Sequence, residues 1–328
     1  MRRRAFLGIL GNAAVSWPLV VRAQSERVRR IGMLMPFPPT NAEMQARTRA
    51  FRDELRKRGW ATSINVQFDE RWTGDNMDLI RSAATNLVNL NPDVILAVGG
   101  RVVPVLMELT HSIPIVNPGG TDPVGSGYAE SLARPGRNVT GFALMEPSVI
   151  SKMLQTLKEI APNVTHISII YNPDNPVGLA FANSFQTAAG SLGVEPTVNH
   201  IHGLADIERA VSVVAAQPNG GIFVPPDVTM SAFPEQTVAT VAQHRLPAIY
   251  SERDFVTKGG LVYYGTDRIQ LYRGAASYVD RILRGEKPSD LPYQQPTKYE
   301  LVINLQAAKA LGLTIPSKLL FTADEVIE

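Results

Sequence analysis

The chain contains no cysteine, and this single absence excludes several kinds of chemistry. Disulfides, thiol nucleophiles, thiolate metal ligands and a lipid-modified N-terminal cysteine are all impossible. Low-complexity tracts are also missing, and 45% of the 328 residues are hydrophobic while 19% are charged. This composition excludes collagen-like, coiled-coil and disordered chains. The length is sufficient for two domains of ordinary size or for one large one.

The sequence also lacks the common motifs of enzymes. No G-x-G-x-x-G follows the first predicted strand, and neither G-x-x-x-x-G-K-[ST] nor G-x-S-x-G occurs. His200 and His202 alternate along a predicted strand, but no third ligand stands at a metal-binding spacing. We therefore predict a protein that is not an enzyme, with no catalytic residues, no metal and no cofactor.

Net charge is small, formally +2, and its positive excess lies at the N-terminus. Residues 1–23 hold Arg2, Arg3, Arg4 and Arg22 and no acidic residue, so the remainder of the chain carries more acidic than basic side chains. The apparent basicity therefore gives no support to a nucleic-acid partner, and we expect none.

The N-terminus has the architecture of a secretory signal peptide. The run of arginines precedes an apolar stretch, 5–21, that is shorter than the roughly 20 residues of a membrane-spanning helix. Val21 and Ala23 suit the −3 and −1 positions of a cleavage site before Gln24. Residues 3–7, RRAFL, also fit the twin-arginine export pattern, and an ordinary secretory leader remains the alternative. We expect a periplasmic mature protein.

The rest of the chain has the pattern of one unit that occurs twice. Short apolar runs typical of buried parallel strands alternate with stretches of helical periodicity. The predicted strands are 31–35, 64–68, 93–98 and 114–116 in the first half, and 167–171, 194–201, 222–224 and 247–250 in the second. Gly59 and Gly193 end corresponding helices, and Pro114 and Pro247 begin corresponding strands. The sequence therefore predicts an α/β fold of two similar lobes, each a doubly wound parallel sheet covered by helices on both faces.

Three further segments predict connections between the lobes. They are the strand-like links 139–144 and 261–264 and the extended stretch 288–296, which follows a long amphipathic helix. A few such crossings allow the lobes to close around a ligand by hinge motion. The predicted lobes comprise 28–142 with 268–296, and 143–267 with 297–328.

Ligands of open parallel sheets bind beyond the carboxyl ends of the strands, so the loops there are the candidate site. Glycine in these loops lets the main chain approach a ligand, and two facing sheet edges form a cleft. Glu146, just past the first crossing, is a candidate for a hinge or a ligand contact. The candidate ligand-binding residues are Pro38, Gly99, Gly100, Gly119, Gly120, Thr121, Asp122, Glu146, Asn172, Asn175, Asp227, Tyr250 and Tyr264.

Each of these candidates also has a structural interpretation. Asp122 could cap a short helix or meet a ligand amine, and Asp227 is the better electrostatic candidate for an ammonium group. The pair Gly99 and Gly100 could offer amides to a carboxylate or form a plain turn. Tyr250 and Tyr264 could stack on an aromatic solute or serve only in packing.

Three long stretches resemble the solute-binding proteins of ABC transporters, in the group whose characterised members take up tryptophan or related small molecules. They are PIVNPGGTDPVGSGYAESLARPGRNVTG (Pro114–Gly141), YSERDFVTKGGLVYYGTD (Tyr250–Asp267) and LPYQQPTKYELVINLQAAKALGLTIP (Leu291–Pro316). The resemblance covers the whole mature chain. It implies a type 1 periplasmic-binding-protein-like fold, in which three crossings join two α/β lobes, and does not identify the solute.

The expected function is capture of a small amino acid-like or aromatic molecule and its delivery to a membrane permease, by a protein that we expect to be a monomer. A sensor that signals to a membrane receptor would have the same sequence features, and an exported enzyme is the third possibility. A transcription regulator with these lobes would need an N-terminal helix-turn-helix, where the leader stands.

Overall fold

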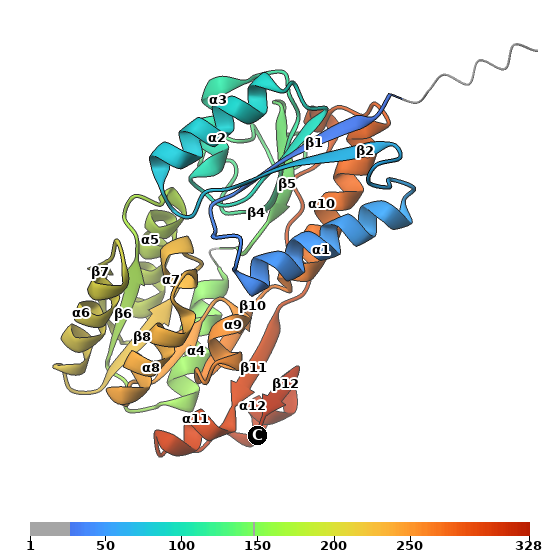
Figure 1. Ribbon diagram of the computed structural model, residues 1–328. Helices are drawn as coiled ribbons and strands as arrows, with labels where there is room; N and C mark the ends of the chain where they lie inside the picture. The colour runs from blue at the N-terminus through green and yellow to red at the C-terminus, as the bar shows by residue number, and fades with distance from the viewer. Residues whose placement is uncertain (1–26, 147) are drawn as a thin grey trace, which may run out of the picture.

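The computed structural model describes residues 27–146 and 148–328, which fold into two lobes, one above the other in Figure 1. The predicted export leader lies outside these residues. Within the described ranges, no helix combines the length and the hydropathy that a membrane span requires.

The first lobe is built on a five-stranded parallel sheet with the order β2-β1-β3-β4-β5. On one side of β1, Ile31, Met33 and Met35 pack with Phe51 of the first helix, while Leu34 packs on the other side with the next two helices. This alternation gives a sheet covered on both faces. The elements are β1 (Arg29–Met35), α1 (Ala42–Lys57), β2 (Val66–Trp72), α2 (Met77–Asn89), β3 (Val94–Ala97), α3 (Val102–Leu109), β4 (Ile115–Gly120) and β5 (Val139–Ala143).

The second lobe repeats that order and extends it. Its seven-stranded sheet runs β12-β11-β10-β9-β8-β6-β7, so β7-β6-β8-β9-β10 has the same winding as the first sheet. Only β11 runs antiparallel to its neighbour β10. The elements are α4 (Val149–Ile160), β6 (His166–Tyr171), α5 (Pro176–Ser191), β7 (Glu195–His200), α6 (Leu204–Ala215), β8 (Gly220–Val224), α7 (Val228–Ser231), α8 (Pro234–Gln243), β9 (Ala248–Tyr250), α9 (Arg253–Thr257), β10 (Val262–Gly265), β11 (Glu300–Asn304), α11 (Leu305–Ala310), α12 (Ser317–Thr322) and β12 (Glu325–Ile327).

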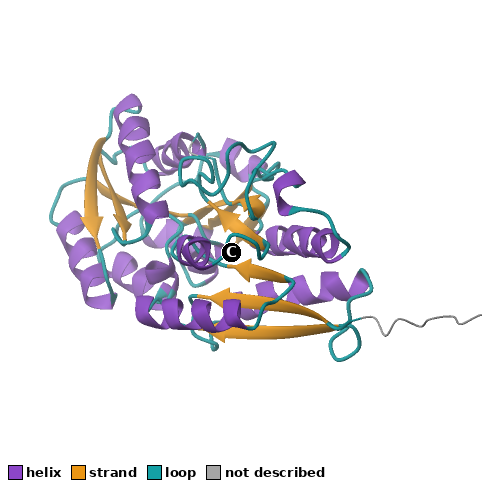
Figure 2. Cartoon of the chain, turned by 90° about the horizontal axis from the view of Figure 1, so that it is seen from above, coloured by secondary structure: helices purple, strands orange, loops and turns teal. Residues whose placement is uncertain are grey.

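Three crossings join the lobes, and helix α10 (Arg268–Leu283) shows why they are needed. It follows the second sheet in sequence but packs on α1 and β4 of the first lobe, beside the helix drawn in blue in Figure 1. The chain then returns past the short 3-10 turn Pro288–Asp290 to β11. Helices flank the strands in the view from above (Figure 2), and the predicted fold of two similar doubly wound lobes is confirmed.

The crossings lie side by side and are hydrogen-bonded to each other. The Thr266 hydroxyl donates to the Leu144 carbonyl at 2.8 Å, and Phe142 forms a β-bridge with Gln294. The Glu146 backbone N–H donates to the Tyr299 hydroxyl at 3.2 Å. The three segments therefore form one hinge rather than three independent linkers.

Two local predictions are wrong. Ile64 is 74% exposed and lies in a turn, because β2 begins only at Val66. The predicted loop at 117–120 continues β4, since Asn117 pairs with Gly141 and Gly120 with Ala143 across a bulge. In both cases the pairing partner is distant in sequence, which local periodicity does not reveal. The strand-like character predicted for 139–144 and 261–264 is confirmed, since these stretches contain the sheet strands β5 and β10.

Candidate functional site

A cavity of about 50 Å³ lies between the lobes, at the carboxyl ends of the parallel strands. From the first lobe it is lined by residues that follow β1 and β3 and by the end of β4, and from the second by residues that follow β6, β8 and β9. These residues include Phe37, Gly99, Gly100 and Gly119 on one side and Asn175, Asp227 and Glu252 on the other. The cavity therefore has walls from both lobes.

Direct contacts across the cavity hold the lobes together in a closed arrangement. A guanidinium N–H of Arg47, on α1, donates to a Glu252 carboxylate oxygen of the second lobe at 3.3 Å. The Thr229 hydroxyl donates to an Asp75 carboxylate oxygen at 2.8 Å, and Arg101 donates to the other oxygen of Asp75 at the same distance. The Arg47–Glu252 and Thr229–Asp75 contacts therefore join the two lobes directly.

Two arginines that share one carboxylate form a cluster of charges in the cavity wall. Glu252 accepts from Arg47 on one oxygen, and on the other from Arg268 at 3.1 Å and from the Ser231 hydroxyl at 3.0 Å. Burial alone would raise the pKa of Glu252, but Arg268 and Arg47 outweigh burial and hold that pKa below its usual value. Glu252 therefore stays ionised between the guanidiniums.

In each guanidinium one buried N–H group has no hydrogen-bond partner among the described residues. The Nε atoms of Arg47 and Arg268 are buried and make no hydrogen bond with any described residue. Burial lowers the pKa of the Arg268 guanidinium, whereas the pKa of Arg47 is raised because Glu252 outweighs the effect of burial. Both guanidiniums remain charged, because arginine is not deprotonated in proteins. Unpaired buried donors are costly, so these two N–H groups mark a place for a hydrogen-bond acceptor.

Asp227 contributes a carboxylate to the cavity wall that is already occupied by the backbone. One oxygen accepts from the backbone N–H groups of Thr229 at 2.9 Å and Met230 at 3.2 Å and so caps α7. The other accepts from the Asn172 N–H at 3.0 Å. Burial raises the pKa of Asp227 despite these bonds. Its visible role is to join the ends of β6 and β8, where Asn172 also donates to Thr229.

The structure brings five of the candidate residues to the cavity, namely Gly99, Gly100, Gly119, Asn175 and Asp227. Gly99 adopts a φ of +85°, which favours glycine, and turns the chain at the end of β3. Asn175 caps α5 by accepting from the Val177 N–H at 3.2 Å. A sequence argument from loops at strand ends therefore identified part of this wall.

The remaining candidates lie elsewhere. Pro38 is exposed next to the cavity residue Phe37, and Glu146 lies in the hinge. Tyr250 is buried against Phe255 with ring centroids 5.0 Å apart, and Tyr264 stacks on Tyr299 at 5.8 Å, both within the second lobe. The other four candidates are either buried next to the cavity wall or lie in a separate groove. They are Gly120 and Thr121 behind the cavity wall, Asn172 beneath Asp227, and Asp122 in a lateral groove.

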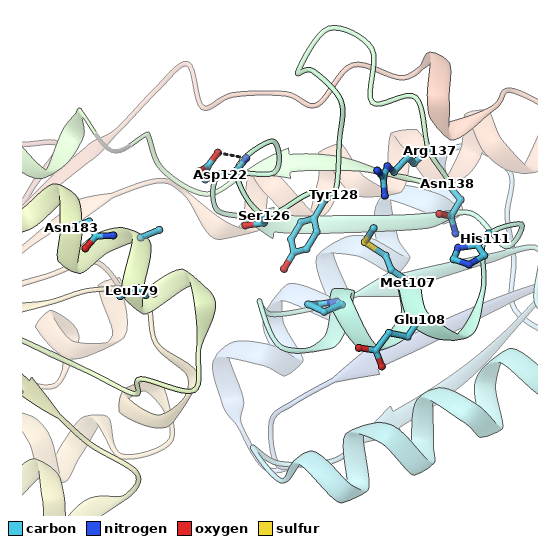
Figure 3. A pocket seen from close by; sticks show the side chains of 13 residues that line it. Met107, Glu108, His111, Asp122, Ser126, Tyr128, Arg137, Asn138, Leu179 and Asn183 are labelled. Carbon is cyan, nitrogen blue, oxygen red and sulfur yellow. Dashed lines mark hydrogen bonds between the residues drawn. The ribbon is translucent and has the colours of Figure 1, made fainter.

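That lateral groove has a volume of about 900 Å³ and also has walls from both lobes (Figure 3). Leu179 and Asn183 of α5 stand on one side, and Tyr128 and Arg137 on the other. Asp122 accepts from the Gly125 N–H at 2.9 Å and so stabilises its own turn. The Tyr128 hydroxyl donates to the Gly100 carbonyl at 3.1 Å, which connects the groove to the cavity wall.

Sequence reasoning missed Arg47, Arg268 and Glu252 as site residues, although each left a signal. Arg47 stands on the buried stripe of α1 between Met44 and Phe51, where an apolar residue is expected. Glu252 follows β9 at the carboxyl end of a parallel strand, and Arg268 opens α10 directly after a crossing. The clearest of these signals is Arg47, because a charged residue on the apolar face of a helix is rarely buried without a partner.

Comparison with known proteins agrees with this architecture. Residues 41–327 match the family described as ABC transporter substrate binding protein. The chain is similar to a tyrosine-binding protein of Clostridioides difficile, with 26% identity over 296 residues that cover 89% of this chain and 83% of that protein. It is also similar to a crystal structure of a conserved domain protein from Vibrio cholerae, with 27% identity, a TM-score of 0.86, and coverage of 92% of this chain and 100% of that one. A further solved structure is an ABC domain from Streptococcus pneumoniae in complex with L-Trp, with 25% identity, a TM-score of 0.85, and coverage of 91% and 99% of the two chains.

Proposed function

Because this chain belongs to the family of ABC transporter substrate-binding proteins, we propose that it captures a small solute in the cavity between its lobes and delivers it to a membrane permease. The chain is a binding protein and not an enzyme. The proposed lobes are 28–142 with 268–296, and 143–267 with 297–328. Export of the mature chain, with cleavage after Ala23, places it where it meets both solute and permease.

The observation that carries the proposal is the origin of the cavity walls. Gly100 and Gly119 come from the first lobe, whereas Asp227 and Glu252 come from the second. A solute that contacts both walls is bound more tightly in the closed state than in the open one, and only such a difference in affinity drives closure. Closure thus converts solute binding into a shape change that a permease can recognise.

The proposed solute is amino acid-like or aromatic. Phe37 and Tyr272 give the cavity aromatic surface, and Arg47 and Arg268 give it buried positive charge. Relatives of this chain are described as binding tyrosine and as holding L-Trp. In its closed form the cavity of about 50 Å³ is smaller than such a solute, so we expect the lobes to open and then close less far around it.

A ligand screen of the mature chain tests the proposal. Thermal unfolding is measured against the L-amino acids, aromatic carboxylates, nucleobases and neutral sugars, since a ligand that binds only the native state raises the Tm with its concentration. We expect a stabilising solute among the amino acids or aromatic carboxylates, with one-to-one binding in calorimetry and unchanged solute by mass spectrometry. If no solute of any class raises the Tm, solute capture is refuted, and conversion of the bound solute would contradict a purely binding role.

A further inference from the structure

The two buried arginines of the cavity have an unfilled capacity to bind an anion. Arg47 is 5% exposed and the Arg268 side chain is 17% exposed, and the Nε–H group of each is buried without a partner among the described residues. Both side chains line the same cavity. Two guanidinium edges with free donors suit a carboxylate, whose two oxygens accept several N–H groups at once.

The acidic groups around the cavity leave both Nε–H groups free for this anion. Glu252 bonds one oxygen to Arg47 and the other to Arg268, and Glu43 on α1 adds a longer ion pair to Arg47 at 3.6 Å. Asp227, the other acidic residue of the wall, already accepts from three backbone N–H groups. None of these acids bonds to the unpaired Nε–H groups. A bound carboxylate would satisfy both donors.

We propose that Arg47 and Arg268 together bind the carboxylate of the solute, while Glu252 is a positioning residue that holds both guanidiniums. The assignment rests on the proposed function, because it concerns the same cavity. The aromatic rings of Phe37 and Tyr272 line the cavity around these arginines. The substrate class is therefore a small carboxylate with an apolar or aromatic body, and a neutral solute of the same shape binds more weakly because it offers these buried donors no charged acceptor.

The position of these groups on different lobes links recognition to closure. Arg47 lies on α1 of the first lobe and Glu252 follows β9 of the second, so opening the cleft separates this pair. In the open form the Arg47 guanidinium is therefore available to an incoming carboxylate, and Glu252 joins it as the lobes close. The carboxylate contact forms first, and the ion pair with Glu252 then holds the cleft shut around it.

The test compares solutes that differ only in the carboxylate. Calorimetry is done with L-tyrosine and L-tryptophan and with their carboxamides, L-tyrosinamide and L-tryptophanamide, and every other binder from the screen is compared with its own amide. We expect each acid to bind and each amide to bind at least tenfold more weakly, because a hydrogen bond to a charged group is worth about 1.5–3 kcal/mol.

Arginine variants then assign the contact to these residues. Arg47→Gln and Arg268→Gln are expected to raise the Kd of the acid about 10- to 100-fold and the Kd of the amide by less, so that the preference for the acid over the amide shrinks. Arg49→Gln on α1 and Arg273→Gln on α10 are the matched controls, because both side chains are exposed on the same two helices. Circular dichroism and the ligand-free Tm identify any variant that fails to fold, and Arg47→Lys and Arg268→Lys then provide folded proteins that keep the charge but lose the paired donors.

The outcomes separate this inference from the proposed function. Amides that bind as tightly as their acids, or folded arginine variants with the affinity of the parent chain, would overturn the carboxylate assignment and leave solute capture intact. Failure of the parent chain to bind any solute would instead refute solute capture, and the assignment with it. Loss of binding in the two control variants would show that the effect is a general loss of positive charge.

Discussion

A single methyl group at Gly100 should hold the cleft open. A Cβ atom added there would lie 2.5 Å from Cγ2 of Val177 and 2.9 Å from Oδ1 of Asn175, and both neighbours belong to the opposite lobe. Neither can move away easily, because valine is restricted at χ1 and the Asn175 side chain caps α5. The backbone of Gly100 lies outside the left-handed region, so alanine is tolerated within its own lobe.

The magnitude follows from the cost of overpacking. Inserting one methyl group into a close-packed contact costs about 1–3 kcal/mol, and here the cost falls on the closed state alone. Because binding requires closure, the apparent Kd of the solute should rise by about 5- to 150-fold. Unfolding of the ligand-free chain should change little, since the open form relieves the clash.

Two measurements check this prediction. Calorimetry of Gly100→Ala gives the affinity for the solute found by screening, and small-angle X-ray scattering of the ligand-free protein should give a larger radius of gyration than the parent chain. Gly190→Ala on α5 is the control, because this glycine is exposed and a Cβ added there would meet nothing within 4 Å. An unchanged Kd and radius of gyration for Gly100→Ala would refute the reasoning that these lobes touch when the protein works.

The remaining predictions concern stability. Glu252→Gln removes the carboxylate that Arg47 and Arg268 share and leaves Arg47 only its longer ion pair with Glu43, so it should lower the free energy of unfolding by about 3–5 kcal/mol in urea titrations, and a loss below about 1 kcal/mol would contradict the buried ion pairs. Since the folded pKa of Glu252 is depressed, its stabilising contribution is fully present above the unfolded value of 4.5 and is lost as the pH falls through the lower folded value. The difference in Tm between the parent chain and Glu252→Gln should therefore shrink on acidification, and a constant difference down to low pH would exclude this linkage. Gly141→Ala places a Cβ against the backbone carbonyl of Asn117 and should cost about 3 kcal/mol or prevent folding, as measured by soluble yield and urea denaturation, whereas a stable variant would show that β4 and β5 pair less closely.

Most of the fold could be predicted from local pattern because each lobe is built from short-range units. The strands predicted at 31–35 and 167–171 lie within β1 and β6, because a short apolar run identifies a buried strand without any distant partner. The predictions failed where the decisive partner is remote. Asn117 belongs to a strand only because Gly141 pairs with it, and Tyr250 is buried in a core of its own lobe together with Ile170 and Val302.

The candidate site also contains some residues that local pattern predicts and others that only remote contacts bring together. Gly99 and Asp227 were identified at the cleft from the rule that ligands meet the carboxyl ends of parallel strands, a rule that needs only the order of elements. Arg47 and Glu252, 205 residues apart, lie in separate segments that no local pattern connects. Loop composition indicated which edges face the cavity, but it contained no information about which charged side chains turn inward from helices.

By itself the sequence determined the α/β class, the two repeated halves and the edge at which a ligand would bind, because strand and helix periodicity and glycine and proline positions act over a few residues. Only the tertiary structure decided that Arg47, Glu252 and Arg268 meet. Burying three charges in one place is favourable only when folding brings all of them within bonding distance at once, and that condition depends on how the two lobes come together.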